Sequence, residues 1–371
     1  MKSKKFSFVL IGRVISSGLQ GIFFLIFATL LEPEQYGNLS YLISLAGTFA
    51  VISRFGLNHT VIVQQAKQNH LLANQINILF LIFTVVASIF LLAINVFAAL
   101  LCLATSFFVM NIHNQIGIKE YKRYFWLNVT KGLLIIIIPI PMYYIFDLPG
   151  ILLGMSIGYL LSSFNFIKSL QINFEFKKLK EHYLVIIHNF GVDSSNRLGK
   201  FVDKLLIAPL MGFTTLGIYQ LNIQILFALE IFPIALHFFL LSEESSGKTH
   251  KKVSLVIIVA SCFIVILVIL FSPFFIDTFF PKYSEGILGL QILIISLVPL
   301  TLSAIFNAKL QAEESTKIGY SAIVRIASLL LFITLLSETY GLIGLSLSVL
   351  ISTSLNTGFL FFIFRRHKFK H

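Results

Sequence analysis

The segment SNRLGKFVDKLLI, from Ser195 to Ile207, places charged residues between two apolar stretches. Its charged residues are Arg197, Lys200, Asp203 and Lys204. What these charges do depends on whether the segment crosses a membrane. The rest of the chain answers that question.

The composition is that of a membrane protein. Of the 371 residues, 57% are hydrophobic and only 12% are charged, about half the charged fraction of an ordinary soluble domain. Apolar runs recur from end to end, each roughly as long as the segment that crosses the hydrocarbon core of a bilayer. Strands of a membrane barrel would alternate instead of forming continuous runs. We therefore predict an all-α polytopic protein of the cytoplasmic membrane.

About twelve apolar runs can be separated along the chain. Turn signals divide many of them, including EPEQYG at 32–37, DLPG at 147–150 and PKYSEG at 281–286. The predicted spans are 7–31, 37–56, 73–94, 96–116, 124–145, 148–169, 184–211, 215–241, 253–276, 285–308, 318–336 and 341–364.

The basic residues test this number. Loops on the cytoplasmic side of a membrane are enriched in lysine and arginine. With both termini in the cytoplasm, 21 of the 28 basic residues fall in cytoplasmic segments, and only Lys282 falls in an external loop. The basic clusters at 177–180 and 248–252 are then both cytoplasmic, so an even number of crossings separates them. The segment 215–241 is plainly apolar and must cross, so 184–211 must cross as well, with its charges.

A faint internal repeat divides the chain in two. LLEPEQYGNLSYL at 30–42 aligns with LMGFTTLGIYQLN at 210–222, and this pairs Leu30 with Leu210 and Gly37 with Gly217. We predict two six-helix bundles, 1–180 and 181–371, related by an axis along the membrane normal. Parallel repeats of this kind occur in transporters, which hold their substrate between the halves.

These two places also carry a family resemblance. LLEPEQYGNLSYLISLAGTFAVISRFGL and FVDKLLIAPLMGFTTLGIYQL resemble the polysaccharide-biosynthesis (O-antigen type) flippases. Those proteins belong to the multidrug/oligosaccharidyl-lipid/polysaccharide (MOP) exporter superfamily, with the multidrug and toxin extrusion (MATE) antiporters and the lipid II flippase. The resemblance implies alternating access and a polyprenyl-diphosphate-linked glycan as substrate.

The charged residues of the seventh span would share one helix face. Asp193, Arg197, Lys200 and Lys204 follow the spacing i, i+4, i+7, i+11, and Asp203 lies beside them. A charge at the centre of a bilayer costs about 2.5–3.5 kcal/mol even on the mildest scale, so this face should line a wet interior. The spans also contain Arg13, Glu230 and Arg325. We predict a cationic substrate cavity lined by Arg13, Arg197, Lys200, Lys204 and Arg325.

Two alternatives remain open for these charges. Asp193 with Arg197, and Asp203 with a nearby lysine, could instead neutralise each other in purely structural pairs. Asp203 and Glu230 are also candidate sites for a coupling ion, because a buried carboxylate can titrate near neutral pH. Arg13 and Lys131 lie near cytoplasmic ends of their spans, so these two side chains could instead simply extend to the cytoplasmic surface.

Three function classes follow from these features. The first is a flippase for polyprenyl-diphosphate-linked oligosaccharide in the lipid bilayer, with glycosyltransferases or a polymerase of the same pathway as partners. The second is a MATE-type antiporter, whose cavity should be acidic to attract cationic drugs. The third is a membrane polysaccharide polymerase, which the short external loops disfavour. We predict no enzymatic activity, no cofactor and no metal. Because the basic residues mark span ends, we also predict no nucleic-acid partner.

Overall fold

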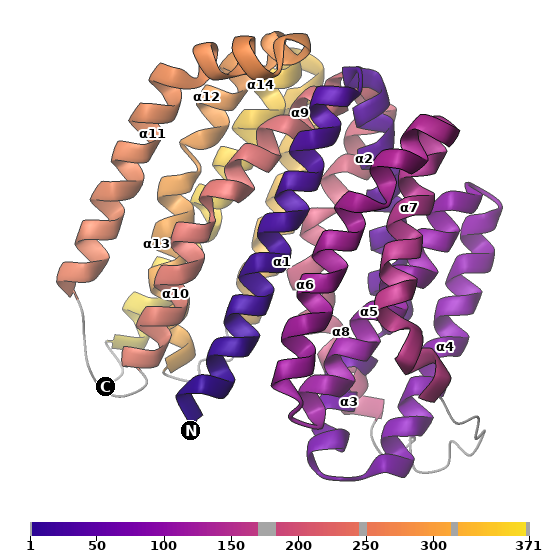
Figure 1. Cartoon of the computed structure of the whole chain (residues 1–371). Helices are drawn as coiled ribbons and strands as arrows, with labels where there is room; N and C mark the ends of the chain where they lie inside the picture. Colours follow the sequence, from indigo (N-terminus) through magenta and orange to yellow (C-terminus); the bar gives the residue numbers. More distant parts are fainter. Residues whose placement is uncertain (1, 170–182, 245–250, 313–317, 369–371) are drawn as a thin grey trace. The chain divides into compact units, whose positions relative to one another are not determined.

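The computed structural model describes residues 2–169, 183–244, 251–312 and 318–368. Within these ranges every regular element is a helix (Figure 1). The helices are α1 (Lys2–Leu30), α2 (Pro33–Arg54), α3 (Leu57–Ala66), α4 (His70–Leu92), α5 (Val96–Gly117), α6 (Tyr121–Ile137), α7 (Pro139–Ser169), α8 (Tyr183–Arg197), η2 (Leu198–Lys200), α9 (Val202–Leu229), α10 (Ile231–Glu244), α11 (Lys251–Phe279), η3 (Pro281–Gly286), α12 (Ile287–Ile294), α13 (Leu297–Ala312) and α14 (Ile318–Lys368).

The predicted membrane spans are present as helices. By length and composition, eight helical stretches among the described residues could cross a membrane, or nine if α2 and α3, which bend by 48°, form one broken span. Three of these stretches contain a non-helical residue: Asp147 in α7, Gly212 in α9 and Gly341 in α14. Each break divides its stretch in two, and the part of α7 before Asp147 continues α6. The described helices therefore accommodate about twelve crossings, with breaks at or next to the ends of predicted spans.

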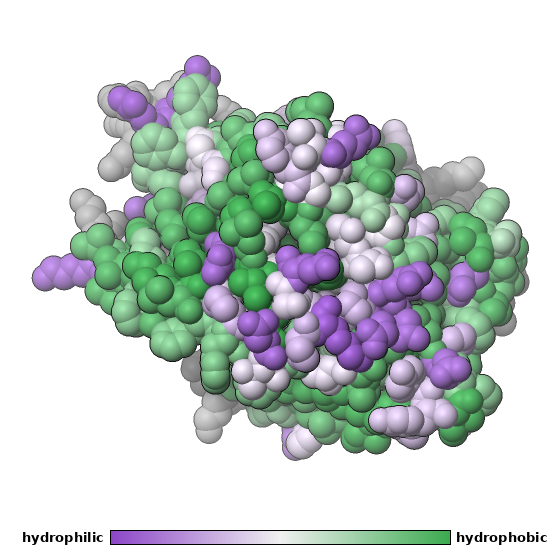
Figure 2. Space-filling model, turned by 90° about the horizontal axis from the view of Figure 1, so that it is seen from above, coloured by the Kyte–Doolittle hydropathy of each residue, from purple (hydrophilic) through white to green (hydrophobic). Residues whose placement is uncertain are grey.

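The surface of the helices is suited to lipid. Large apolar side chains stand exposed on α4 and α11, for example Phe90 at 67% and Phe274 at 70% exposure. Many large apolar side chains exposed along whole helices suit an apolar solvent, such as the bilayer core. Figure 2 shows both hydrophilic and hydrophobic residues on the surface that is seen from above. The protein is a multi-pass membrane protein.

The chain folds into two compact units. Unit 1 comprises residues 1–23 and 41–202, and unit 2 comprises residues 24–40 and 203–371. These compact units are a different division of the chain from the predicted repeat halves, 1–180 and 181–371. The halves remain a prediction about the internal repeat. The unit boundaries after residues 23 and 202 lie within the first predicted span of each half, 7–31 and 184–211. The alignment that pairs Gly37 with Gly217 pairs residue 23 with residue 203, so the two boundaries fall at nearly equivalent places.

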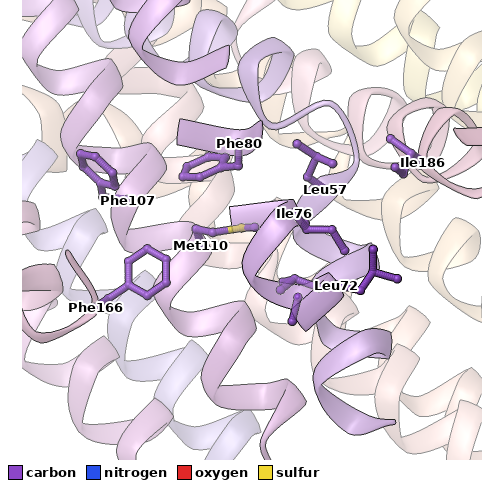
Figure 3. Packing of buried hydrophobic residues seen from close by; sticks show 10 residues of the cluster. Leu57, Leu72, Ile76, Phe80, Phe107, Met110, Phe166 and Ile186 are labelled. Atoms are coloured by element: carbon purple, nitrogen blue, oxygen red, sulfur yellow. The ribbon is translucent and has the colours of Figure 1, made fainter. Parts of the chain in front are cut away.

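The core of unit 1 is built around the short helix α3. Side chains from α3, α4, α5, α7 and α8 meet in one apolar cluster (Figure 3). The chain bends into α3 at Phe55 and Gly56, which both have positive φ angles, of 44° and 73°. A Cβ on Gly56 would overlap the backbone of α8 at Ile186 and Phe190. The glycine therefore permits both the bend and the close approach of α8.

In unit 2 the helical segments that follow the two repeated turns pack closely against each other. A Cβ on Gly37 would overlap the carbonyl oxygen of Phe213, and a Cβ on Gly217 would overlap the carbonyl oxygen of Pro33. The contacts are reciprocal, because the alignment that pairs Gly37 with Gly217 also pairs Pro33 with Phe213. This geometry supports the repeat that the sequence indicates. Both positions require glycine, since any side chain would force the two backbones apart.

Candidate functional site

The charged segment Ser195–Ile207 is not one regular helix. Helix α8 ends at Arg197, the 3₁₀ turn η2 covers Leu198–Lys200, and α9 begins only at Val202. The prediction that Asp193, Arg197, Lys200 and Lys204 share one α-helical face is therefore wrong. Tertiary packing explains the break: the Phe201 ring lies where α2 has Gly47, and a Cβ on that glycine would come within 2.6 Å of the ring.

The break also distributes the charges between the two units. Arg197 and Lys200 belong to unit 1, whereas Asp203 and Lys204 belong to unit 2. Arg197 is half-buried and Lys200 is exposed. The backbone of Asp193 lies in α8, but its side chain lies outside the described residues.

In unit 2, Asp203 and Lys204 form a buried ion pair. Both residues are 4% exposed. The Lys204 ammonium donates to both carboxylate oxygens of Asp203, at 3.1 and 3.2 Å, and the Tyr219 hydroxyl donates to Oδ2 at 3.0 Å. Arg325, which is half-buried on α14, lies within electrostatic range of Tyr219. This geometry is the structural pairing that the sequence left open for Asp203, so much of the Lys204 charge is already compensated.

In unit 1, four basic residues lie near one another: Arg54, His59, His113 and Arg197, which we call the basic cluster. Arg54, the last residue of α2, is only 4% exposed. His113 is within electrostatic range of Arg54, His59 and Arg197, and its ring meets the His59 ring edge-on at 5.7 Å. From the sequence, Arg54 at the end of the predicted span 37–56 counts among the basic residues of the cytoplasmic segments, and neither histidine is predicted as a site residue.

Hydrogen bonds orient the basic cluster. His113 Nδ1 donates to the Val109 carbonyl at 2.6 Å, which leaves Nε2 as the acceptor for the Asn58 amide at 3.4 Å. On α8, the Asn189 amide donates to the Thr60 hydroxyl at 3.1 Å and so ties the helix of Arg197 to α3. The bend into α3 therefore places residues from α2, α3, α5 and α8 around one point in unit 1.

A buried layer of amide side chains comes from residues that are near those of the basic cluster in the sequence. Asn77 and Asn114 donate to each other at 3.3 and 2.9 Å, and Gln65 donates to Asn114 at 2.9 Å. These residues come from α3, α4 and α5, the same helices that form the core. Buried amides are stable inside a protein when they satisfy one another. This layer cannot be recognised from the sequence, because no single span contains more than part of it.

Lys131 was also misinterpreted from the sequence. It does not extend to the cytoplasmic surface: it is 5% exposed, in the interior of unit 1. Its ammonium lies 5.7 Å from the ring centre of Phe108 and 5.6 Å from that of Tyr159. The lysine therefore lies between helices α5, α6 and α7.

The remaining predicted residues lie apart from these groups. Arg13 is exposed on α1, and Glu230 is half-buried at the junction of α9 and α10. None of the predicted roles in substrate binding or ion coupling is tested by this placement, so they remain predictions. Among the described residues, no group of three or more His, Cys, Asp or Glu side chains is arranged to hold a metal ion.

Comparison with known proteins identifies the fold. Residues 3–118 match the family of polysaccharide biosynthesis proteins. An uncharacterized membrane protein of Methanocaldococcus jannaschii is 28% identical, over 93% of this chain and 94% of that protein.

Two solved structures are similar in fold. One is an inward-facing MATE family multidrug resistance transporter of the MOP superfamily, with a TM-score of 0.73 and 14% identity over 97% of this chain and 98% of the other.

The second structure is the lipid II flippase MurJ in an inward closed conformation. It has a TM-score of 0.68 and 15% identity, over 96% of this chain and 87% of MurJ. At these identities the two structures establish the fold of the chain and nothing about its substrate. The N-terminal third of the chain therefore resembles polysaccharide biosynthesis proteins, and the whole chain shares the fold of these two transporters.

Proposed function

We propose that this protein is a membrane flippase that moves a polyprenyl-diphosphate-linked oligosaccharide from the cytoplasmic to the outer leaflet by alternating access. The observation that carries the proposal is the basic cluster of unit 1. Its arginines, Arg54 and Arg197, bring two permanent positive charges close to His113 in unit 1. Charged residues within membrane helices commonly mark a transport pathway, and an anionic substrate would give these two arginines a function.

A diphosphate is the group that this cluster suits. Guanidinium groups bind phosphate oxygens through two parallel hydrogen bonds and keep their charge at every physiological pH. The Arg54 side chain enters from the end of α2 and the Arg197 side chain from the end of α8. A sugar headgroup without phosphate carries no charge that two arginines could bind, so it would gain little binding free energy from them. A diphosphate would regain in the protein part of the electrostatic stabilisation that it loses on leaving water.

The same cluster argues against the second candidate function. A MATE-type antiporter for cationic drugs needs acidic groups near its substrate. In the described part of unit 1, the residues whose charges act on His113 are all basic: Arg54, His59 and Arg197. The third candidate, a polysaccharide polymerase, would be an enzyme, and the family match and the MOP fold favour a transporter.

The experiment is to measure flipping in liposomes that contain the purified protein. The probe is a polyprenyl-diphosphate disaccharide with a fluorescent label, whose outer-leaflet fraction is read by chemical quenching of the label. A fluorescent cationic drug serves as the competing substrate. We expect the protein to equilibrate the lipid between the leaflets and to leave the drug untouched. Transport of the drug alone would overturn the proposal.

Variants locate the phosphate site. Arg197→Ala should slow lipid flipping at least about tenfold, since a lost charge-assisted hydrogen-bond pair is worth roughly 1.5–3 kcal/mol. Arg197→Lys should retain more activity than Arg197→Ala. Lys200→Arg should likewise retain more than Lys200→Gln. If Arg197→Ala instead lowers the amount of folded protein, and Asp193→Asn in the same chain restores both protein and flipping, Arg197 has a structural role only.

The proposal extends to the protein partners of this flippase. The substrate would be made on the cytoplasmic face, so we expect glycosyltransferases or a polymerase of the same pathway to be functional neighbours of the protein. Purification from native membranes after mild crosslinking, followed by mass spectrometry, tests this association. Recovery of unrelated membrane proteins only would contradict it.

A further inference from the structure

We propose that Lys131 is a proton-binding group through which a proton gradient drives transport. The proposal rests on the proposed function, because it names the driving ion of that flippase. Lys131 stands ten residues after the start of α6, about 15 Å along the helix axis, and is buried inside unit 1. A titratable group buried among membrane helices can receive a proton from one side and release it to the other.

The surroundings of Lys131 are aromatic. The ammonium faces the rings of Phe108 on α5 and Tyr159 on α7, and these rings meet edge-on with their centres 5.6 Å apart. Glycines bring the helices together here. A Cβ on Gly132 would lie 2.6 Å from Leu19 of α1, and one on Gly158 would lie 3.3 Å from the backbone of α6 at Ile135. The lysine is thus held between α5 and α7 by close helix packing.

Among the described residues, no carboxylate lies within ion-pair distance of Lys131 Nζ. The two aromatic faces stabilise an ammonium and do little for a neutral amine, while burial without a counter-charge favours the amine. These opposing effects make the charge of Lys131 depend on its contact with the rings and on its access to water. A small rearrangement of α5, α6 and α7 would change the proton affinity.

Few of the side chains that face Lys131 could bind the proton in its place. From α5 the facing residue is Phe108, from α7 it is Tyr159, and from α1 it is Leu19, beside Gly132. Tyr159 is the titratable residue among these. On α6 itself, the buried face also carries Tyr124 and Asn128, two turns and one turn toward the cytoplasmic end. Asn128 donates to the Tyr124 carbonyl at 2.9 Å, and the exposed Arg13 lies within electrostatic range of Tyr124.

This polar face offers a route for the proton. Tyr124, Asn128 and Lys131 follow the spacing i, i+4, i+7 and so line one side of α6 from its start to Lys131. In the proton-transfer step, an N–H bond of the Lys131 ammonium breaks, its electron pair stays on Nζ, and the proton passes to water. Rebinding from the other side reverses the step. Asp203 is less suited to this role, because Lys204 and Tyr219 already occupy its carboxylate.

The first test applies a pH gradient to the liposomes that contain the fluorescent polyprenyl-diphosphate disaccharide. With one proton coupled to each lipid, a gradient of one pH unit supports up to about a tenfold ratio of lipid between the leaflets. Wild-type protein should approach that ratio. Lys131→Gln and Lys131→Arg should reach an equal distribution with or without the gradient. The control is Lys122→Gln, an exposed lysine on the same helix, which should behave as wild type. Accumulation by Lys131→Gln would overturn the proposal.

The second test needs no substrate and therefore separates this inference from the proposed function. Trp126, the only tryptophan of the chain, lies five residues before Lys131 on α6. We expect its fluorescence in lipid nanodiscs to change with pH in a single transition that Lys131→Arg abolishes, because arginine stays protonated throughout. Lys122→Gln should keep the transition. If wild type does not flip the lipid but Trp126 shows the transition, the substrate assignment fails and the Lys131 site stands. If Lys131→Arg keeps the transition, the Lys131 site fails.

Discussion

Two lysines of this protein are almost equally buried, and their surroundings are opposite. Lys204 in unit 2 donates to a carboxylate that also accepts a tyrosine hydroxyl, whereas Lys131 in unit 1 lies against two aromatic rings. The first arrangement fixes the charge, because removing the proton from Lys204 would leave Asp203 unpaired. The second leaves the charge free to change. Burial alone therefore does not indicate the role of a membrane lysine; its partner does.

The largest expected effect comes from breaking the ion pair of unit 2. Asp203→Ala leaves Lys204 buried without its partner and should lower the free energy of unfolding by about 3–5 kcal/mol. Thermal unfolding in detergent and the yield of membrane-inserted protein measure this loss. The double change Asp203→Asn with Lys204→Met should recover most of it.

An exposed pair provides the control for Asp203→Ala. Glu32 and Lys282 form an ion pair at 2.8 Å with side-chain exposures of 61% and 42%. Glu32→Ala should cost no more than about 1 kcal/mol, since water and salt screen an exposed pair. Equal losses in the two variants would show that the Asp203–Lys204 pair does not differ from a surface contact.

A smaller effect is expected from the tyrosine that completes the pair. Tyr219→Phe removes a hydrogen bond to a charged acceptor and should lower the free energy of unfolding by roughly 1.5–3 kcal/mol. Tyr36 of the same unit is also fully buried, and its hydroxyl has no hydrogen-bond partner among the described residues. Tyr36→Phe should therefore be neutral or stabilising in the same unfolding measurement. A loss for Tyr36→Phe as large as that for Tyr219→Phe would contradict the assigned role of the Asp203 contact.

The smallest effect on stability is expected at Lys131. Lys131→Met keeps the length of the side chain and removes a charge that has no carboxylate partner in the described part of the chain. It should change the free energy of unfolding by less than about 1 kcal/mol or increase it. Lys204→Met, which removes the ion-pair partner of Asp203, should clearly lower the free energy of unfolding under the same conditions. If both lysine variants unfold alike, the contrast between the two sites is not real.

The class of the protein and its membrane spans could be predicted from local patterns in the chain. Apolar runs of bilayer length and turn signals are local properties, and they located the breaks near Asp147, Gly212 and Gly341 to within a few residues. The alignment of Gly37 with Gly217 could also be made from the sequence. Both positions require glycine, because a side chain at either would collide with the backbone of the other segment. The resemblance to polysaccharide-biosynthesis flippases followed from those same two turns.

Which charged residues meet could not be predicted in this way, because it depends on tertiary packing. Helical spacing predicted one continuous basic face, but the helix is interrupted at Leu198–Lys200, next to Phe201, which packs against Gly47. From sequence spacing, Arg54 and Lys131 could both lie near the cytoplasmic surface, although both are buried by helices distant in the chain. The physical reason is that hydrophobicity and turn chemistry act within one segment, whereas the surroundings of a charge depend on which helices pack around it.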